Sequence, residues 1–166
     1  MVSSRGLKVS VEGSNAYITL NTTGSDLYGS YTSIEQLTGN WILFGVEVNW
    51  TTKTYKLYLN GSYVKTETQS GLSGSAPDIS SDATITFLRS GGVARQGLLK
   101  DFRFYTRELT TTEHRNAFLK QRITDGLKIE YTFQNDIPAG YIVDSSGNNL
   151  HSDWVGVLSS DYKKVI

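Results

Sequence analysis

Apolar and polar residues alternate along much of the chain, which is the pattern of strands that turn one face toward a protein core. The longest apolar row runs in steps of two over residues 42–50, and the residues between its members turn polar toward the end. A second row covers residues 127–133, and we expect both rows to lie in the core. Shorter segments of the same kind predict further strands at residues 7–11, 16–20, 55–59, 62–68, 83–88, 98–105, 141–143 and 154–157.

Turn residues separate these segments. Asn60-Gly61 stands between two of them and predicts a tight hairpin, because both residues tolerate a positive φ. Gly91-Gly92 predicts a second turn, and the Ser- and Gly-rich residues 70–82 predict a surface loop. The chain therefore alternates between short strands and turns over most of its length.

One helix is expected. Thr110 and Glu113 have the spacing of a capping box, in which each residue bonds the backbone near the other. Ala117, Phe118 and Leu119 supply apolar residues, and the helix should end after two or three turns, before Asp125-Gly126.

The number and spacing of strands decide the fold class. Roughly ten short strands with one short helix predict an all-β, antiparallel two-sheet jelly-roll sandwich. The 166 residues are long enough for one domain with a real core, so residues 1–166 are expected to form a single domain.

Composition mainly excludes certain classes of partner and of chemical site. Sixteen basic and sixteen acidic residues cancel, so strong attraction to nucleic acid or to an anionic membrane is not expected. With no cysteine, there is no disulfide, thiolate metal site or cysteine nucleophile. The first residues hold no apolar run of the length of a signal peptide or membrane span. We therefore expect no membrane insertion, and either release from the cytosol, as for virion proteins, or export by a signal outside this sequence.

Three segments together resemble the concanavalin A-like lectin/glucanase superfamily, in particular its laminin-G-like branch. The segment GNWILFGVEVNWTTKTYKLYLNGSYV is similar to the tryptophan-led strand of that branch, its next strand and its Tyr-x-Asn-Gly hairpin. GLLKDFRFYTRELTTTEH resembles its closing strand and helix start, and LKIEYTFQNDIPAGYIVDSSGNN resembles its opening strand and Asp-Ser-Ser-Gly-Asn turn. They cover about half of the chain, and the coincidence of all three is what makes the resemblance specific.

The order of these segments is reversed relative to the family, in which the Asp-Ser-Ser-Gly-Asn turn comes first and the strand with the helix comes last. Three explanations stay open. The chain is circularly permuted, which neighbouring termini allow; it exchanges strands with a neighbouring chain and forms a homo-oligomer; or its ends cut across two tandem domains.

Catalytic patterns were sought among the acidic and histidine residues. Glucanases of the resembling superfamily use paired carboxylates on one strand. Glu47 has only Asn49 beside it on its face, and Glu130 stands alone on its strand, so both are expected to face solvent. His114 is expected on the helix surface and His151 in a polar loop, without a nucleophile nearby. The expectation is that the chain is not an enzyme.

The resemblance also implies a structural calcium ion between the opening turn and the closing strand. Asp101, Asp144 and Asn148 occupy the matching positions. Lys100 replaces the first acid of the closing pair, which removes one ligand and adds a positive charge. A calcium site and a metal-free Asx turn therefore both stay open.

Non-catalytic members of the superfamily bind glycans or proteins, with aromatic rings on sugar faces and polar side chains on hydroxyls. Aromatic and polar candidates outside the core rows are Tyr28, Tyr31, Tyr58, Tyr63, Trp154, Asp153, Asn149 and Arg95. The first hypothesis is a lectin-like adhesion module that recognises glycans on a virion or extracellular surface. The second is a structural protein that decorates or joins a virion assembly and binds no sugar.

Overall fold

The computed structural model describes backbone and side chains of residues 40–68, 100–134 and 141–152. It also describes the backbone of five further strands: β1 (Gly6–Glu12), β2 (Asn15–Thr22), β3 (Ser25–Thr32), β7 (Arg89–Ser90) and β8 (Val93–Ala94). Within these residues the secondary structure is mostly strands in antiparallel sheets, with one short helix. The all-β, antiparallel class is therefore confirmed, while the two-sheet jelly-roll arrangement stays a prediction.

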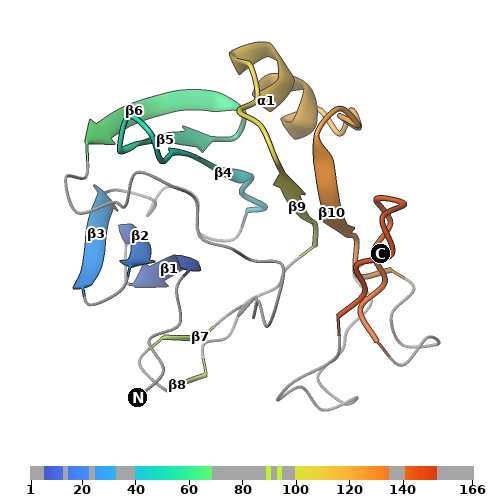
Figure 1. Cartoon of the computed structure of the whole chain (residues 1–166), viewed down its shortest axis with the longest axis horizontal. Helices are drawn as coiled ribbons and strands as arrows, with labels where there is room; N and C mark the ends of the chain where they lie inside the picture. Colours follow the sequence, from blue (N-terminus) through green and yellow to red (C-terminus); the bar gives the residue numbers. More distant parts are fainter. Residues whose placement is uncertain are drawn as a thin grey trace. The chain divides into compact units, whose positions relative to one another are not determined.

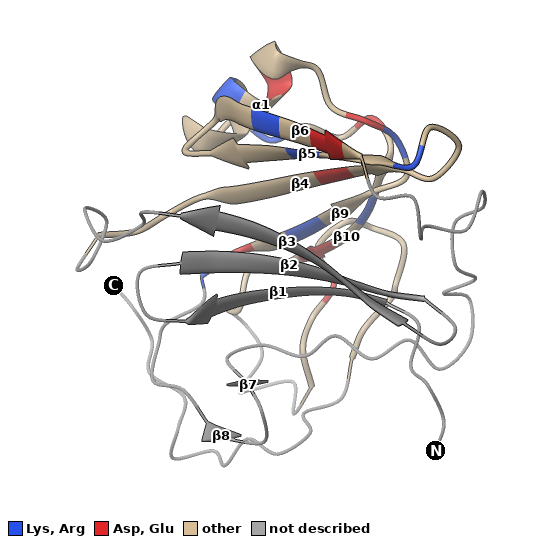
Figure 2. Ribbon diagram, turned by 90° about the vertical axis from the view of Figure 1, so that its left-hand side faces the viewer, with Lys and Arg blue, Asp and Glu red and all other residues tan. Residues whose placement is uncertain are grey.

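The chain divides into two compact units, each assembled from two separate segments. The first unit comprises Met1–Gly97 and Leu109–Gln121, and the second comprises Leu98–Glu108 and Arg122–Ile166. Charged side chains of both signs occur on the strands of each unit (Figure 2). The single-domain organisation expected from the sequence stays a prediction.

The first three strands form an antiparallel meander in the order β1-β2-β3 (Figure 1). β1 and β2 confirm the two alternating segments near the start of the chain. β3 was missed, because Asp26, Gly29 and Ser30 interrupt any apolar row along it. Its pairing with β2 is continuous over all eight residues, so the neighbouring strand, rather than its own pattern, defines this element.

The second sheet of this unit has the order β4-β5-β6 and contains its described core. The strands are β4 (Phe44–Asn49), β5 (Thr54–Leu59) and β6 (Ser62–Thr68). Tyr55 and Leu57 of β5 are each 1% exposed, and partly buried apolar residues pack against them: Phe44, Val46, Val48, Trp50 and Val64. The alternating row at 42–50 thus faces the core as expected, although the strand begins two residues later and the row is only half-buried.

The predicted hairpin between β5 and β6 is confirmed. Asn60 has a φ of 50° and Gly61 a φ of 78°, the left-handed values that a two-residue turn needs. The Asn60 side chain accepts a hydrogen bond from the Leu43 backbone N–H, and the Asn60 N–H donates to the Leu43 carbonyl. A Cβ at Gly61 would lie 2.9 Å from both Arg115 Cα and Phe118 Cβ, so this turn fits closely against the helix.

Replacing Gly61 with alanine is expected to lower the free energy of unfolding by about 2 kcal/mol, since a left-handed residue and a clash with helix backbone add together. Gly147 supplies the matched control, because its φ is 95° but nothing lies within 4 Å of its added Cβ. Gly147→Ala should therefore cost only the backbone contribution, about 1 kcal/mol. Urea unfolding of both variants checks this, and equal costs would mean that the helix does not press on the turn.

The helix α1 (Thr111–Phe118) begins and ends close to the expected residues. Thr110 accepts from the Glu113 N–H, and the Glu113 side chain accepts from the Thr110 N–H, so the capping box is confirmed. The side-chain orientation differs from the expectation. α1 buries His114, whereas Phe118 is 43% exposed and the following Leu119 is 57% exposed.

In the second unit, β9 (Phe102–Tyr105) and β10 (Leu127–Tyr131) pair antiparallel, with a register shift between Leu127 and Ile129. The strand predicted at 141–143 is reduced to an isolated bridge from Ile142 to Ser152. A further bridge joins Tyr131 to Asp144. The loop at 70–82, the strands at 83–88 and 154–157 and the turn residues Gly91-Gly92 lie outside the described residues, although β7 and β8 pair on either side of that turn.

Candidate functional site

Asp144, which follows the bridge at Ile142, is the centre of the most elaborate polar arrangement of the second unit. Its carboxylate is buried and accepts four hydrogen bonds. Oδ1 accepts from the backbone N–H groups of Glu130 and Ser146, both at 2.9 Å. Oδ2 accepts from the Ser146 hydroxyl at 2.8 Å and from the Leu150 N–H at 2.9 Å. The side chain therefore closes the turn that follows it and ties this turn to β10.

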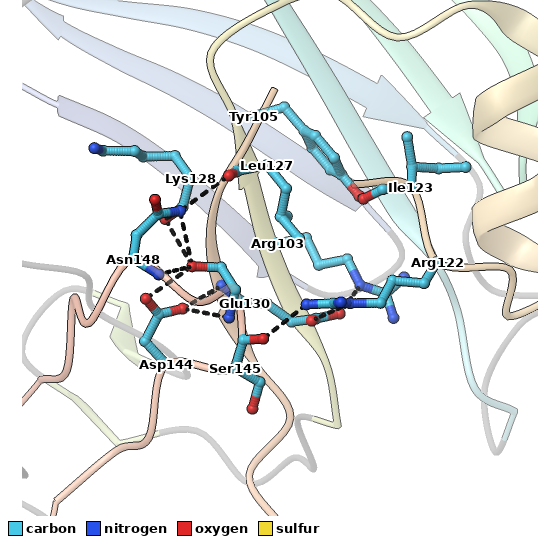
Figure 3. A network of polar contacts seen from close by, with 11 residues as sticks. Arg103, Tyr105, Arg122, Ile123, Leu127, Lys128, Glu130, Asp144, Ser145 and Asn148 are labelled. Carbon is cyan, nitrogen blue, oxygen red and sulfur yellow. Dashed lines mark hydrogen bonds and ion pairs between the residues drawn. The ribbon is translucent and has the colours of Figure 1, made fainter. Parts of the chain in front are cut away.

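The polar side chains of the turn add a second attachment to β10. The Asn148 amide nitrogen donates to the carbonyls of Leu127 and Lys128, at 3.1 and 3.0 Å, and the Ser146 Oγ lies 3.1 Å from the Lys128 carbonyl oxygen. Figure 3 shows Asn148 and Asp144 on the same side of β10, with Lys128 and Glu130 next to them. The turn is thus fixed to Leu127, Lys128 and Glu130 of the strand.

Glu130 of β10 is only 4% exposed and holds two arginines. Its Oε1 accepts from Arg103 Nε of β9, and its Oε2 accepts from Arg122 Nε, both at 2.8 Å (Figure 3). Arg122 also donates from Nη2 to the Ser145 carbonyl at 2.7 Å. The expectation of a solvent-facing Glu130 is therefore wrong, because two cations cover a carboxylate that the strand pattern alone assigns to the polar face.

Burial and hydrogen bonding shift the ionisation of this network in opposite directions. Burial by itself raises the pKa of the Asp144 carboxyl, but the N–H groups of Glu130, Leu150 and Ser146 outweigh it and hold that pKa below its ordinary value. Burial, followed by the nearby Asp144 charge, raises the pKa of Tyr131. Asp144 is therefore held as the anion on which the turn depends.

Asp144 should make the stability of the protein depend on acidity. A carboxyl whose pKa is depressed by folding contributes stability above its unfolded pKa, about 3.9, and loses it as the pH falls through the folded value. We expect the stability difference between the wild type and Asp144→Asn to be largest at neutral pH and to shrink below about pH 4. Thermal melts of both proteins against pH measure it, and a constant difference would contradict this role.

Exposed side chains gather on the outer part of this turn, and we call Tyr141, Asn149, Leu150 and His151 the turn surface. The Tyr141 and His151 rings lie 5.0 Å apart between centroids, and Tyr141 is 37% exposed. Asn149 is exposed and has a φ of 57°. These residues present one aromatic pair and one amide group to solvent.

The turn surface is supported from beneath. His151 Nδ1 accepts from the Asp144 backbone N–H at 3.0 Å, which leaves the ring proton on Nε2 in the neutral imidazole. The buried Tyr131 hydroxyl donates to the Leu150 carbonyl at 2.9 Å. These contacts hold the His151 ring and the Leu150 carbonyl, so this part of the turn surface is supported by buried groups.

A second buried polar cluster lies in the first unit, between β4 and α1. Glu47 Oε1 accepts from the Leu109 N–H and contacts His114 Nε2, both at 2.9 Å. Lys56 Nζ and the Tyr58 hydroxyl lie 3.3 and 3.4 Å from Oε2. The expectations of a solvent-facing Glu47 and a surface His114 are both wrong, because the helix covers the polar face of the sheet.

This cluster is arranged for packing rather than for reaction. The His114 and Tyr58 rings stack at 3.5 Å between centroids, and Gly45 leaves room for the histidine. Burial, followed by the Glu47 charge, raises the pKa of Tyr58. Both Glu47 oxygens are engaged by groups of the protein, which leaves no free acceptor for a substrate proton. That the chain is not an enzyme stays a prediction.

The predicted ligand-binding residues fall into three groups. Tyr63 and Asn149 are exposed, while Tyr58 is buried beneath His114 and cannot offer its ring to a sugar. Tyr28 and Tyr31 lie on β3, of which only the backbone is described. Arg95, Asp153 and Trp154 lie outside the described residues. Sequence reasoning missed Tyr141 and set His151 aside, and the signal for both was their position on either side of the Asp144 turn.

The donor set around Asp144 does not fit the calcium ion that the family resemblance implies. A carboxylate offers about four lone-pair positions, and the four donors of the protein already engage them. Asp101 is exposed, and Asn148 ties the turn to β10 through its amide nitrogen. Among residues 40–68, 100–134 and 141–152, no group of three or more His, Cys, Asp or Glu side chains could hold a metal ion.

We expect the turn to be metal-free. Adding millimolar calcium or excess chelator should leave the melting temperature unchanged, because no ligand position on Asp144 is open. Differential scanning fluorimetry of the wild type measures this, with Asp144→Asn as the control for an unspecific effect of the salt. A rise in melting temperature with calcium that Asp144→Asn abolishes would contradict a metal-free turn.

Comparison with known proteins yields little. No family model and no curated protein matches the chain. Among solved structures, it is similar to residues 221–444 of an S-layer domain-containing protein from Clostridium thermocellum ATCC 27405, at 18% identity and a TM-score of 0.37. The match covers 70% of this chain and 57% of that one, so the chain spans little more than half of that structure. Separately, no helix in the described part of the chain is long and apolar enough to cross a membrane.

Proposed function

We propose that the chain is a non-catalytic, lectin-like binding module whose ligand is a glycan on an extracellular or virion surface. The observation that carries this proposal is the turn surface, which has an exposed tyrosine–histidine ring pair and, two residues before the histidine, the exposed Asn149. Aromatic rings stack on the apolar faces of sugars, while amide and imidazole groups bond their hydroxyls. Such a surface binds a sugar without any reactive group.

The rigid support of the turn surface strengthens this assignment. Ligand binding is weakened when loops must be ordered first, and a surface held in place beforehand avoids that cost. Asp144 holds the backbone N–H groups of Ser146 and Leu150, and Tyr131 holds the Leu150 carbonyl. The buried network therefore acts as the support of a binding surface.

The fold proposed for this module is a concanavalin A-like jelly-roll sandwich with its segment order changed. The Asn60-Gly61 hairpin, the capped helix and the Asp144 turn that joins β10 all agree with the resemblance that the sequence carries. Circular permutation and strand exchange predict different particle masses, since only exchange requires a second chain. Sedimentation at several concentrations separates them, with a monomer favouring permutation and an interlocked oligomer favouring exchange.

A glycan array followed by titration of any ligand found tests the function. Tyr141→Ala should weaken binding by about tenfold or more, as expected for an aromatic anchor. Asn149→Gly removes the amide group while still tolerating the positive φ, and should weaken binding by a smaller factor. Leu119→Ser is the matched control, because it replaces an exposed apolar residue just after α1. This variant should bind the glycan as the wild type does.

Each result of the glycan array either supports the proposal or contradicts it. Binding that is lost in Tyr141→Ala and kept in Leu119→Ser supports the proposal. Binding that survives Tyr141→Ala places the glycan elsewhere, and silence across surface polysaccharides favours the structural decoration or assembly protein. Hydrolysis of a β-glucan would replace a binding module with an enzyme.

A further inference from the structure

The burial of side chains along α1 differs from that of an ordinary surface helix. Such a helix turns apolar side chains to the core and charged ones to solvent. Here the buried side chain is His114, whereas Phe118 and the next residue, Leu119, are 43% and 57% exposed. The burial of a histidine needs a physical reason, and the exposure of two apolar residues leaves an apolar surface at the end of the helix.

The inner face explains the orientation. The strand face beneath α1 carries Glu47 and Tyr58, and His114 satisfies both by a 2.9 Å contact and a stacked ring. A phenylalanine at that position would leave the buried carboxylate without one of its donors, which is costly. The sheet therefore selects the histidine, and Phe118 and Leu119 are left outside.

The end of the helix and the neighbouring strand carry a set of exposed residues, which we call the helix-end patch: Tyr63, Arg115, Phe118, Leu119 and Lys120. Phe118 and Leu119 follow Arg115 by three and four positions, so the three are neighbours on one side of the helix. Tyr63 of β6 is 51% exposed and packs edge-on against Tyr58, which stacks on His114. The Asn60-Gly61 turn lies against Arg115 and Phe118 and joins the strand end to the helix.

The charge on the helix-end patch has one sign. Arg115 and Lys120 are both exposed, and no acidic side chain of the described residues forms an ion pair with either. Aromatic residues and arginine around an apolar centre are the composition of protein–protein interfaces. Two cations that have no acidic partner among the described residues favour an acidic occupant.

We propose that the helix-end patch is a docking surface for a protein segment that carries acidic and large apolar side chains. A second copy of the chain fits less well, because a two-fold contact through this patch would bring the same cations together. The patch is separate from the turn surface in residues and in chemistry. The proposal therefore does not depend on glycan binding and would give the module an attachment to its own assembly.

Selection from a library of random short peptides against the immobilised wild-type protein tests the proposal. The selected peptides should be enriched in Asp, Glu, Leu and Phe relative to the unselected library. A synthetic copy of one of them should bind about tenfold more weakly to Phe118→Ser and Leu119→Ser. Phe118→Ser keeps the Cβ that lies against Gly61. Arg115→Gln should weaken binding at low salt more than at high salt, because salt screens exposed charges.

Tyr141→Ala is the matched control, since it removes an exposed aromatic ring from the turn surface and should leave peptide binding unchanged. The proposal is overturned if no acidic, apolar peptides are enriched, or if their binding ignores the patch variants. Two further results also overturn it. A melting temperature that falls by several degrees in Leu119→Ser would mean that the chain itself covers the patch. A wild-type dimer that becomes a monomer in Leu119→Ser would assign the patch to a second copy.

Discussion

Replacing Glu130 with alanine is expected to lower the free energy of unfolding by about 3–5 kcal/mol, which is the usual cost of breaking a buried ion pair from one side. The carboxylate is 4% exposed and accepts from Arg103 and Arg122, so its loss leaves two guanidinium groups facing each other without an anion. Since small domains are stable by about 5–15 kcal/mol, this variant should be near the limit of folding.

Glu130→Gln keeps the size and shape of the side chain but removes its charge, so it measures the contribution of the charge to stability. Each Glu130 oxygen accepts from a different arginine, so an amide would turn its own N–H groups toward one of the two donors. Glu130→Gln should therefore still cost about 2–3 kcal/mol. Asp125→Ala is the exposed control, because that side chain is 83% exposed and pairs with Arg107, and it should cost less than about 1 kcal/mol. Similar midpoints for the three variants in urea unfolding would contradict the buried network.

Removing the Glu47 side chain is expected to cost about 3 kcal/mol, since Glu47→Ala leaves the Leu109 N–H and His114 Nε2 without their acceptor in a buried place. Glu47→Gln should cost less stability than Glu130→Gln does. Both of those contacts are made by a single oxygen, Oε1, which an amide keeps. The other oxygen faces the Tyr58 hydroxyl, which can accept as well as donate, and the partly exposed Lys56.

Glu47→Gln is therefore expected to lose only about 1 kcal/mol. Glu67→Gln provides the control on the same sheet, because its side chain is 35% exposed and pairs with Lys65, and should cost about 1 kcal/mol or less. Chemical unfolding of the three variants measures the differences. If Glu47→Gln lost as much stability as Glu47→Ala, the negative charge rather than the shared acceptor would hold the helix.

The strands near the middle of the chain were predictable because each is indicated by residues within or next to it. Alternation located the row at 42–50, and Asn60-Gly61 located the hairpin that follows. The capping box located α1 within a residue. β3 was not predictable in this way, because its residues carry no alternating row and its existence depends on pairing with β2. Local sequence patterns therefore predicted the elements that have a pattern of their own. They missed β3, which forms because it pairs with β2.

The buried acids were not predictable from the same patterns. Alternation placed Glu47 correctly on the face opposite the core row, but a polar face is exposed only if nothing covers it. The covering residues are 62 and 67 positions away in the sequence, at Leu109 and His114. Glu130 is likewise covered by Arg103, 27 positions earlier. For the Asp144 turn, an Asx turn was at least one of the two open alternatives, because most of its donors lie within six residues.

The sharing of one carboxylate by several backbone amides has a consequence for how this region opens. The N–H groups of Glu130, Ser146 and Leu150 all end on Asp144, so none of them loses its partner until that side chain moves. Local opening in proteins occurs in cooperative units defined by such shared contacts. The strand end and both halves of the turn should therefore open and close as one unit, in a single step without a half-open form.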